Sequence, residues 1–353
     1  MANPPPPPQD PGDSIIFSNF EGLRNTVTAE RLKPTELERA LNIDIDDAGQ
    51  IHRRRGYTKV SDGAFHSLFT NNSGRMYVVK DGTLGVLYPN YTFESLLPNV
   101  GNDPLDYVQV GGDVYFSSMT ASGVISMENI VSQWGQQVAP GQWLSPVVRP
   151  TETLPPTKGK FIAAPPMATS LTYWNGRIYL ANGNTVWATE LYLYNYVDNT
   201  RNFLNFESEV TMLATVTDGL YVGTVDHVWF LSGPFVEMKR IPIMSYGVMP
   251  RSSVEVPAEL IKPQINQDPQ SPIRNAVMFM TKTGLCAGFD GGIIYNLTQA
   301  EVIFPDAVSA APMFRRQDGV NSYVVVTDSG GTPAANTRIG DWVDVEIRRF
   351  QGA

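Results

Sequence analysis

Short runs of branched and aromatic residues, each ending at a turn that contains Gly or Asn, recur along most of the chain. The clearest run is 174–187, Trp-Asn-Gly-Arg-Ile-Tyr-Leu-Ala-Asn-Gly-Asn-Thr-Val-Trp. Asn175-Gly176 predicts a two-residue hairpin turn, because both positions need positive φ and Asn and Gly adopt it at low cost. Asn182-Gly183-Asn184 repeats the signal one strand later. The stretch therefore predicts three short strands of a β-meander.

Six copies of this pattern can be aligned by their leading turn glycines, Gly74, Gly112, Gly176, Gly219, Gly284 and Gly319. Their spacings of 38, 64, 43, 65 and 35 residues bracket the period of about 40–50 residues that is typical of propeller blades, with two insertions. The repeats predict an all-β, β-propeller-like fold of five or six blades over residues 61–335. A large β-sandwich with many hairpins is the alternative that fits the same turns.

Two Pro-rich stretches, at about 126–169 and 232–275, interrupt the rhythm of turn and strand. Segments of that length without regular strand and turn signals tend to be functional or extended. We expect them to cross over the blades, or to supply contacts between neighbouring subunits in an assembly.

The two ends of the chain have their own patterns. Residues 1–13 open with five consecutive prolines, which favour an extended, solvated arm. Residues 14–20 read as a strand without a local partner, and the C-terminal segment 336–353 contains alternating apolar and acidic positions. We expect one of these two segments to close the propeller by pairing with the blade at the other end of the chain.

Between the arm and the repeats, residues 14–60 combine a strand, a short helix and a basic strand. Lys33–Leu41 predicts the helix, because Pro34 suits a first helical turn and Leu37 and Leu41 form one apolar edge. The chain then enters an acidic turn, followed by Arg53, Arg54 and Arg55. This dense basic run gives three candidate assembly contacts, and a solvated strand edge is the alternative interpretation. In a strand, Arg53 and Arg55 share one face.

Composition narrows the function classes. Among 353 residues, 26 Lys and Arg face 35 Asp and Glu, which gives a net charge of −9. Proteins that grip DNA by its phosphates are usually basic, so an acidic surface that lets DNA pass is favoured over one that binds it. The single Cys286 excludes an internal disulfide framework. The absence of a signal-type or spanning apolar run predicts a soluble protein made in a reducing cytoplasm, without membrane insertion of its own.

No active site is predicted, and neither is a metal or another cofactor. The acidic run Asp44, Asp46 and Asp47 lacks the Glu that a calcium loop needs at its twelfth position, where Arg55 stands. The histidines, His52, His66 and His227, lack metal-like spacing. Asp113 and Glu190 could be chosen as a glycosidase pair only by guesswork. We therefore expect a protein that is not an enzyme.

A motif in the N-terminal region resembles the start of the tail nozzle, or tail hub, proteins of short-tailed bacteriophages. It comprises Phe20, Gly22, Leu23 and Asn25, followed by Asn42, Asp44, Asp46, Gly49, Arg53, Arg54, Gly56 and Tyr57. The motif covers roughly residues 17–60, and the propeller-like repeats extend the resemblance to most of the chain as architecture only.

The resemblance implies a structural virion protein that is synthesised in the host cytoplasm and forms the distal tail tube. Such nozzles assemble as a homohexameric ring beneath a tail adaptor or connector protein and carry or neighbour tail fibres or spikes. Double-stranded DNA passes through them during genome ejection without specific binding. The alternatives are a carbohydrate-binding or glycan-cleaving propeller, or another component of the head-to-tail connector.

Overall fold

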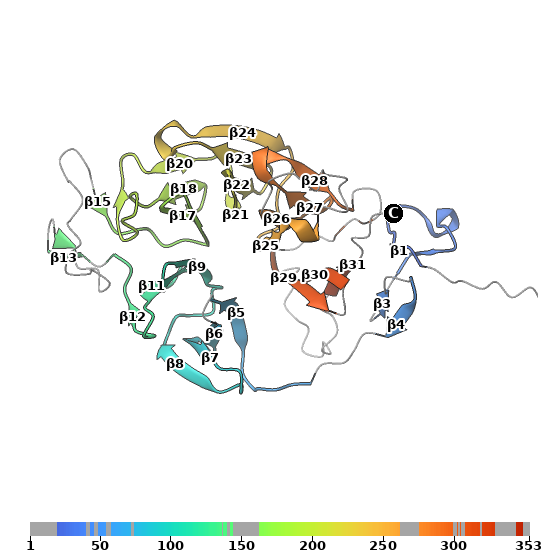
Figure 1. Cartoon of the computed structure of the whole chain (residues 1–353), viewed down its shortest axis with the longest axis horizontal. Coiled ribbons are helices and arrows are strands. Elements are labelled where there is room, and N and C mark those ends of the chain that lie inside the picture. The colour runs from blue at the N-terminus through green and yellow to red at the C-terminus, as the bar shows by residue number, and fades with distance from the viewer. Residues whose placement is uncertain are drawn as a thin grey trace, which may run out of the picture.

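The computed structural model describes residues 20–39, 43–45, 49–53, 58–71, 74–135, 137–139, 142–143, 162–261, 275–298, 302, 304, 308–317, 320–328 and 344–348. Within these ranges the regular structure is β-strand, with short 3-10 turns and no α-helix. Figure 1 shows the strands as small sheets arranged around a common centre. The predicted all-β, propeller-like fold is confirmed.

Six antiparallel sheets, called blades 1 to 6 below, follow one another along the chain. Blade 1 contains β5 (Phe65–Thr70), β6 (Met76–Lys80), β7 (Thr83–Leu87) and β8 (Phe93–Leu97). Blade 2 contains β9 (Asp106–Val110), β10 (Asp113–Ser117), β11 (Ser122–Ile125) and β12 (Val131–Ser132). Blade 3 contains β16 (Ser170–Trp174), β17 (Arg177–Asn182), β18 (Thr185–Ala188) and β20 (Phe203–Asn205).

The second half of the ring repeats the same order of strands. Blade 4 contains β21 (Val210–Val216), β22 (Gly219–Thr224), β23 (Val228–Ser232) and β24 (Lys239–Met244). Blade 5 contains β25 (Val254–Pro257), β26 (Asn275–Thr281), β27 (Gly284–Gly288) and β28 (Ile294–Asn296). Blade 6 contains three described strands, β29 (Ser309–Gln317), β30 (Val320–Asp328) and β31 (Asp344–Arg348).

The first strand of each blade lies nearest the centre and the last described strand lies outermost (Figure 1). Each of the five junctions between successive blades contains its own hydrophobic cluster. Between blades 1 and 2, for example, Tyr77 and Val79 pack with Tyr107 and Phe116. Each Å² of apolar surface removed from water contributes about 25 cal/mol of stability. These junctions are therefore the main source of the stability of the fold.

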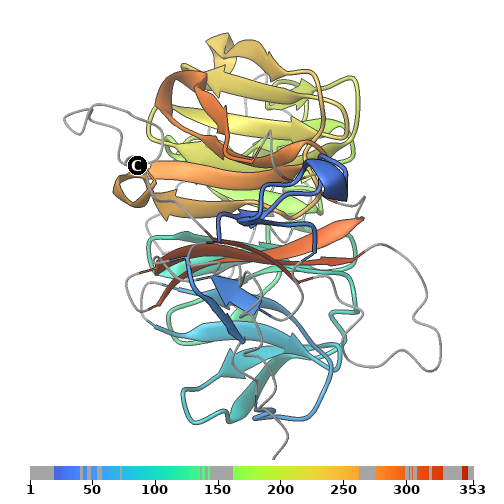
Figure 2. The same cartoon turned by 90° about the vertical axis from the view of Figure 1, so that its right-hand side faces the viewer.

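An N-terminal unit, comprising the described residues between 20 and 53, lies beside blade 6 (Figures 1 and 2). It contains β1 (Gly22–Leu23), the 3-10 turn η1 (Ala29–Arg31), β2 (Glu36–Leu37), β3 (Ile43–Ile45) and β4 (Ile51–Arg53). Leu23 packs against the cluster between blades 5 and 6, so this contact anchors the unit to the ring.

The turn signals placed the repeats correctly. The aligned leading turns lie between the first and second strands of the blades, and Asn175 and Gly176 take φ values of 47° and 77°. Positive φ at both positions is what the predicted hairpin requires. The last of these turns, at 318–319, lies outside the described residues, although β29 and β30 on either side of it pair as expected.

The short helix predicted for Lys33–Leu41 is wrong over the described residues 33–39. Instead, β2 pairs in parallel with β1, with Leu37 opposite Leu23. The Glu36 carboxylate also accepts a hydrogen bond from the Lys33 backbone N–H at 3.0 Å. A helix of this length is marginal in water, and pairing with the anchored β1 gives the same residues a more extensive set of contacts.

The predicted Pro-rich insertion at about 232–275 is wrong for its described residues, because β24 and β25 are regular strands of blades 4 and 5. Pro242 is accommodated in β24 because this is the outermost strand of its blade, where one side of the backbone has no ladder partner to satisfy. Part of the predicted insertion at about 126–169 belongs to a blade. Residues 131–132 complete blade 2, and the described strands beyond them lie outside the six blades: β13 (Gln137–Ala139), β14 (Gln142–Trp143) and β15 (Ile162–Ala163).

The C-terminal strand does not close the ring in the predicted way. Within segment 336–353, β31 pairs antiparallel with β30 of its own blade, with Val345 opposite Val325. It therefore completes blade 6 and does not join blade 1. The arm at 1–13 and nearly all of the other candidate closing strand, 14–20, lie outside the described residues.

Candidate functional site

The N-terminal unit brings together the two halves of the motif found in the sequence. The Phe20 backbone N–H donates a hydrogen bond to the Gly49 carbonyl at 2.8 Å, which links the first half to the acidic turn of the second. Gly22 has a φ of 128°, and a Cβ built there meets nothing within 4 Å. Glycine is therefore favoured here by its positive φ, since there is room for a side chain.

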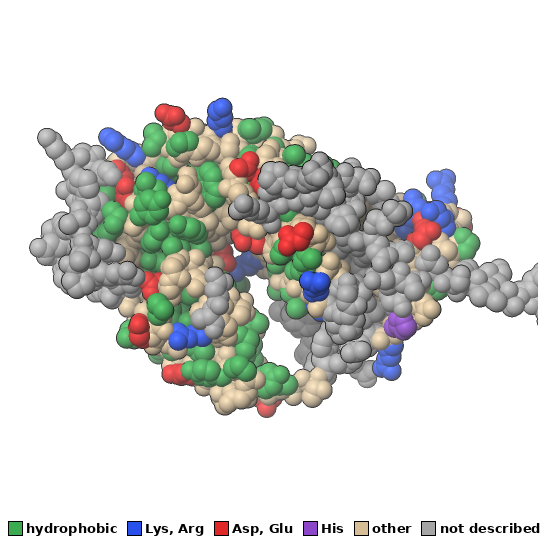
Figure 3. Space-filling model, viewed as in Figure 1, with side chains coloured by type: hydrophobic (Ala, Val, Ile, Leu, Met, Phe, Trp, Pro, Cys, Tyr) green, Lys and Arg blue, Asp and Glu red, His purple; other side chains and the backbone are tan. Residues whose placement is uncertain are grey.

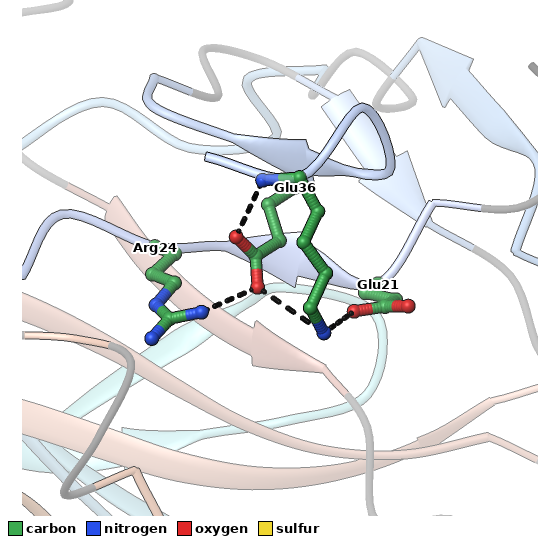
Figure 4. A network of polar contacts seen from close by, with 4 residues as sticks. Glu21, Arg24 and Glu36 are labelled. Atoms are coloured by element: carbon green, nitrogen blue, oxygen red, sulfur yellow. Dashed lines mark hydrogen bonds and ion pairs between the residues drawn. The ribbon is translucent and has the colours of Figure 1, made fainter. Parts of the chain in front are cut away.

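Four charged side chains hold this unit together (Figure 4). Arg24 Nη1 donates to Glu36 Oε1 at 2.7 Å, and Lys33 Nζ lies 3.1 Å from Glu21 Oε2 and 3.7 Å from Glu36 Oε1. The Glu36 side chain is 7% exposed, whereas that of Lys33 is 60% exposed. Screening by water weakens the lysine contacts, so the pair between Arg24 and Glu36 is the principal clamp between β1 and β2.

We expect this clamp to loosen in acid. The hydrogen bond from the Lys33 backbone N–H, followed by the Arg24 guanidinium, holds the pKa of Glu36 below its ordinary 4.5. A lowered carboxyl pKa contributes stability that is present above pH 4.5 and is lost as the pH falls through the lower, folded value. Hydrogen exchange of residues 20–39, corrected for intrinsic rates, should therefore accelerate as the pH falls below 4.5. An E36Q variant should lack this dependence, and equal profiles for both proteins would contradict the assignment.

The predicted assembly contact Arg53 lies on an exposed hairpin. β3 and β4 pair antiparallel with Arg53 opposite Ile43, and Ile51, His52 and Arg53 are all exposed. A two-stranded hairpin is marginally stable by itself, and the hydrogen bond between Phe20 and Gly49 ties this one to the rest of the N-terminal unit. Arg54 and Arg55, and with them the predicted alternation of the basic run, lie outside the described residues.

A second group of polar side chains meets at the centre of the ring. Arg251, in the connection before blade 5, donates from Nη2 to the Pro104 carbonyl at 2.6 Å and to the Thr169 carbonyl at 3.3 Å. These carbonyls precede blades 2 and 3, and blade 2 lies opposite blade 5 in the ring (Figure 1). Arg251 is held in the left-handed region, with a φ of 60°. One arginine side chain thus ties three blades together across the centre.

Asp106, at the start of β9, faces the same centre. Its Oδ2 accepts a hydrogen bond from the Leu171 backbone N–H of blade 3 at 2.7 Å, and its Oδ1 accepts one from the Tyr107 N–H at 2.9 Å. Burial raises the pKa of Asp106, while the bond from Leu171 and the charge of Arg251 oppose that rise. Glu255, on β25, similarly accepts a bond from Thr215 of blade 4 at 3.0 Å. Both acids therefore fasten neighbouring blades together.

Acidic and basic side chains are visible around the hollow near the centre of the ring in Figure 3. Arg251 bonds to the Pro104 carbonyl across this centre, so its side chain lies between opposite blades.

The remaining sequence candidates lie apart from one another. Cys286 is buried, which raises the pKa of its thiol to about 12, as expected for a small hydrophobe in an apolar strand. Asp113 lies on β10 of blade 2, and Glu190, in blade 3, accepts a hydrogen bond from Asn202 at 3.2 Å. His66 lies on β5 of blade 1, and burial lowers the pKa of its imidazole.

The turn at Asp226 and His227 gathers polar groups without forming a catalytic triad. Hydrogen bonds from Ser208 and then Thr224 lower the pKa of Asp226 to about 2. Ser208 and His227 both contact the Asp226 carboxylate, with His227 Nδ1 at 3.2 Å from it. In a triad the histidine contacts the serine hydroxyl, so this arrangement does not activate a nucleophile.

Two negative findings apply to the described ranges alone. They contain no group of three or more His, Cys, Asp or Glu side chains placed to hold a metal ion. They also contain no helix with the length and apolar character needed to cross a membrane.

The central group could not be anticipated from the sequence, because Asp106 and Arg251 lie in separate repeats and neither belongs to a recognisable motif. The only available signal was an acid at the beginning of an inner strand.

No protein-family model and no curated protein matches the chain. Among solved structures, the extracellular domain of BT4673 from B. thetaiotaomicron is similar over 80% of this chain, with 13% identity and a TM-score of 0.45. The match spans 36% of that structure, so this chain corresponds to about a third of its length. The N-terminal domain of Nup159 matches over 74% of this chain and 72% of its own, with 8% identity and a TM-score of 0.40. Sqt1 of Saccharomyces cerevisiae matches over 72% and 65%, with 10% identity and a TM-score of 0.40.

Proposed function

We propose that the chain is a structural subunit of the tail of a short-tailed bacteriophage, where copies of it form the ring-shaped distal tube through which the genome leaves. The observation that carries this proposal is the N-terminal unit. The hydrogen bond between Phe20 and Gly49 joins the two halves of the nozzle-like motif, and the hairpin that follows presents Arg53 to solvent. A motif that builds an exposed, anchored unit beside the propeller is suited to assembly.

The central contacts and the charge of the chain support an oligomeric tube. Arg251 bonds across the centre of one propeller, so we place the DNA channel between protomers. A net charge of −9 favours a channel wall that does not hold phosphates. In this function the chain binds copies of itself, a tail adaptor and tail fibres or spikes, and it performs no catalysis.

Electron microscopy of the purified protein, alone and mixed with a candidate tail adaptor, tests the proposal. We expect end-on views of a six-fold ring with an open channel in at least the mixed sample. Particles that stay monomeric in both samples would overturn the proposal. Hydrolysis or specific binding of a polysaccharide by such monomers would favour a glycan-directed propeller.

Replacing Arg53, Arg54 and Arg55 together by Ala should weaken assembly and leave the fold intact. Loss of about 1.4 kcal/mol of contact energy raises the protein concentration needed for half-assembly about tenfold. Sedimentation velocity across a concentration series measures this change. Arg39→Ala removes another exposed arginine of the N-terminal unit and serves as the matched control. Equal assembly by the triple variant and the control would remove the basic run from the interface.

A further inference from the structure

One peptide group at the centre of the ring is held from both sides. The Pro104 carbonyl accepts a hydrogen bond from Arg251 Nη2 at 2.6 Å. The N–H of the same peptide group, which belongs to Leu105, donates to Ser67 Oγ at 2.8 Å. Ser67 Oγ also lies 2.8 Å from His66 Nδ1. A continuous chain of hydrogen bonds, called the central relay below, therefore connects blades 1, 2 and 5 through the following residues: Arg251, Pro104, Leu105, Ser67 and His66.

Unusual backbone conformations aim two members of the central relay. Ser67 and Arg251 have φ values of 56° and 60°, in the left-handed region that residues other than Gly rarely adopt. The register of β5 against β6 shifts between His66 and Phe69, and Ser67 lies within this bulge. Bulges re-aim side chains, and strain that the fold maintains points to a function of the residues that carry it.

The donors of the central relay all point in the same direction. An arginine can only donate, so the peptide group accepts from Arg251 at its oxygen and donates onward from the Leu105 N–H. Because Ser67 Oγ accepts that bond, we assign its hydroxyl as the donor to Nδ1 of a neutral His66. In this tautomer Nε2 carries the proton, and Nε2 is buried without a partner in hydrogen-bond geometry among the described residues. Bonds aligned in one direction polarise and strengthen one another.

A proton on His66 reverses the last bond of the central relay. An imidazolium donates from both ring nitrogens, so Nδ1 no longer accepts the Ser67 hydroxyl. Ser67 Oγ then has two donors directed at it, the Leu105 N–H and the imidazolium, and its own proton loses its acceptor. The charged ring is also repelled by Arg251 at the other end of the relay. Protonation therefore opposes the relay through its bonds and through its charges.

Two charged side chains act on the His66 imidazole, one from each connection that meets it. Arg251 disfavours its protonation, whereas Asp103, in the connection before blade 2, favours it. Asp103 is exposed and has the weaker effect of the two. Asp106 on β9 acts on Arg251 and accepts its own bonds from backbone N–H groups. On β6, the residue opposite His66 is Val79, which carries no charge.

The corresponding links between other blades end on groups of different chemistry. Ser170 Oγ of blade 3 accepts a hydrogen bond from the Leu213 N–H of blade 4 at 3.3 Å, and a serine hydroxyl does not titrate. Asp106 and Glu255, which link blades 2 to 3 and 4 to 5, are carboxylic acids. Histidine is the side chain whose ordinary pKa places its charge change between pH 5 and 8. Among these described links, the one that ends on His66 is therefore suited to respond to mild acid.

We propose that the central relay is a latch that acid opens. At neutral pH the uncharged His66 completes the relay, and blades 1, 2 and 5 are tied together at the centre. A proton on His66 releases the Leu105 N–H and the connection around it, so the centre of the ring loosens. The apolar clusters between the blades keep the chain folded while this happens. The inference concerns a single chain and does not depend on the proposed function.

The direction of the pH dependence follows from the environment of His66. Burial is the largest cause that lowers its pKa, the Gly101 carbonyl opposes this lowering, and the charge of Arg251 adds to it. The loosened state, in which the imidazole is hydrated, therefore takes up a proton more readily than the latched state. The stability of the latch is fully present above the ordinary pKa of 6.5, and it is lost as the pH falls below 6.5 through the latched value.

Hydrogen exchange of the Leu105 amide tests the latch, because this N–H is the donor that protonation releases. Fragmentation mass spectrometry resolves the amide, and the rates are corrected for intrinsic exchange. Between about pH 7.5 and about pH 5 the corrected rate should rise about tenfold, which corresponds to about 1.4 kcal/mol. A corrected rate that stays constant over this range would overturn the inference.

Two substitutions separate the parts of the central relay. His66→Asn keeps an acceptor oxygen close to the position of Nδ1 but does not titrate, so Leu105 exchange should stay slow in mild acid. Ser67→Gly removes the hydroxyl and suits the positive φ, so Leu105 exchange should be fast at neutral and at acidic pH. His227→Asn is the matched control, because His227 lies in the turn between β22 and β23, and it should retain the acceleration. Equal acceleration in His66→Asn and the control would contradict the role of His66.

Nitrogen NMR of the histidine side chains provides a test that needs no variant to fold, except to assign the signals. At neutral pH His66 should be the tautomer with its proton on Nε2, because Nδ1 accepts from Ser67. Its titration should coincide with the acceleration of Leu105 exchange. The opposite tautomer at neutral pH, or a His66 that remains neutral where Leu105 exchange accelerates, would overturn the inference.

Discussion

Replacing Asp106 by Ala is expected to lower the free energy of unfolding by about 3 kcal/mol. The change removes the acceptor for the Leu171 backbone N–H, which bonds to Asp106 Oδ2 at 2.7 Å. It also removes the charge of Asp106, which opposes the lowering of the Arg251 pKa by burial. Both losses fall at the centre, where blades 2, 3 and 5 meet. Urea denaturation followed by circular dichroism measures the effect.

Asp106→Asn provides the matched control, since an amide retains an acceptor oxygen and should cost only about 1 kcal/mol. Burial raises the pKa of Asp106 above its ordinary 3.8, so the folded state binds the proton more tightly than the unfolded chain does. Stability from this group is therefore highest below pH 3.8 and declines as the pH rises through the folded value. The Asn variant should lack that decline. Equal stabilities of the Ala variant and the unmodified protein would contradict the role assigned to Asp106.

The repeats could be recognised in the sequence because their signals are local. A turn such as Asn175-Gly176 fixes its own conformation through two adjacent residues, and the alternation of apolar positions on either side sets the register of the hairpin. Pairing of strands within each blade follows from these turns, since successive strands are neighbours in every described blade except for the small β19 (Val197–Asp198) between β18 and β20.

The errors arose where distant contacts decide the structure. The residues around Glu36 and Leu37 have helical propensity, but these two residues pair with Gly22 and Leu23. Leu23 is itself anchored against the cluster between blades 5 and 6. Similarly, Pro242 suggested an insertion, but the strand around it lies at the outer edge of blade 4, where proline is tolerated. Local propensity does not reveal that a segment pairs with a strand far away in the sequence.

The central group could not have been found from sequence for a further reason. Arg251 reaches a carbonyl 147 positions earlier in the chain. Such a contact exists only once blades 2 and 5 face each other across a common centre.

Replacing Tyr221 by Ala is expected to lower the free energy of unfolding by about 4 kcal/mol, because a large, fully buried side chain between blades 4 and 5 leaves a cavity. The Tyr221 hydroxyl donates to the Phe289 carbonyl at 2.5 Å and also lies 3.1 Å from the Ile293 carbonyl. Those carbonyls belong to the connection between β27 and β28. Tyr221→Phe should therefore cost only about 1–2 kcal/mol but should accelerate hydrogen exchange in residues 289–293. If exchange there were unchanged in the Phe variant, Tyr221 would support the core without holding the connection between β27 and β28.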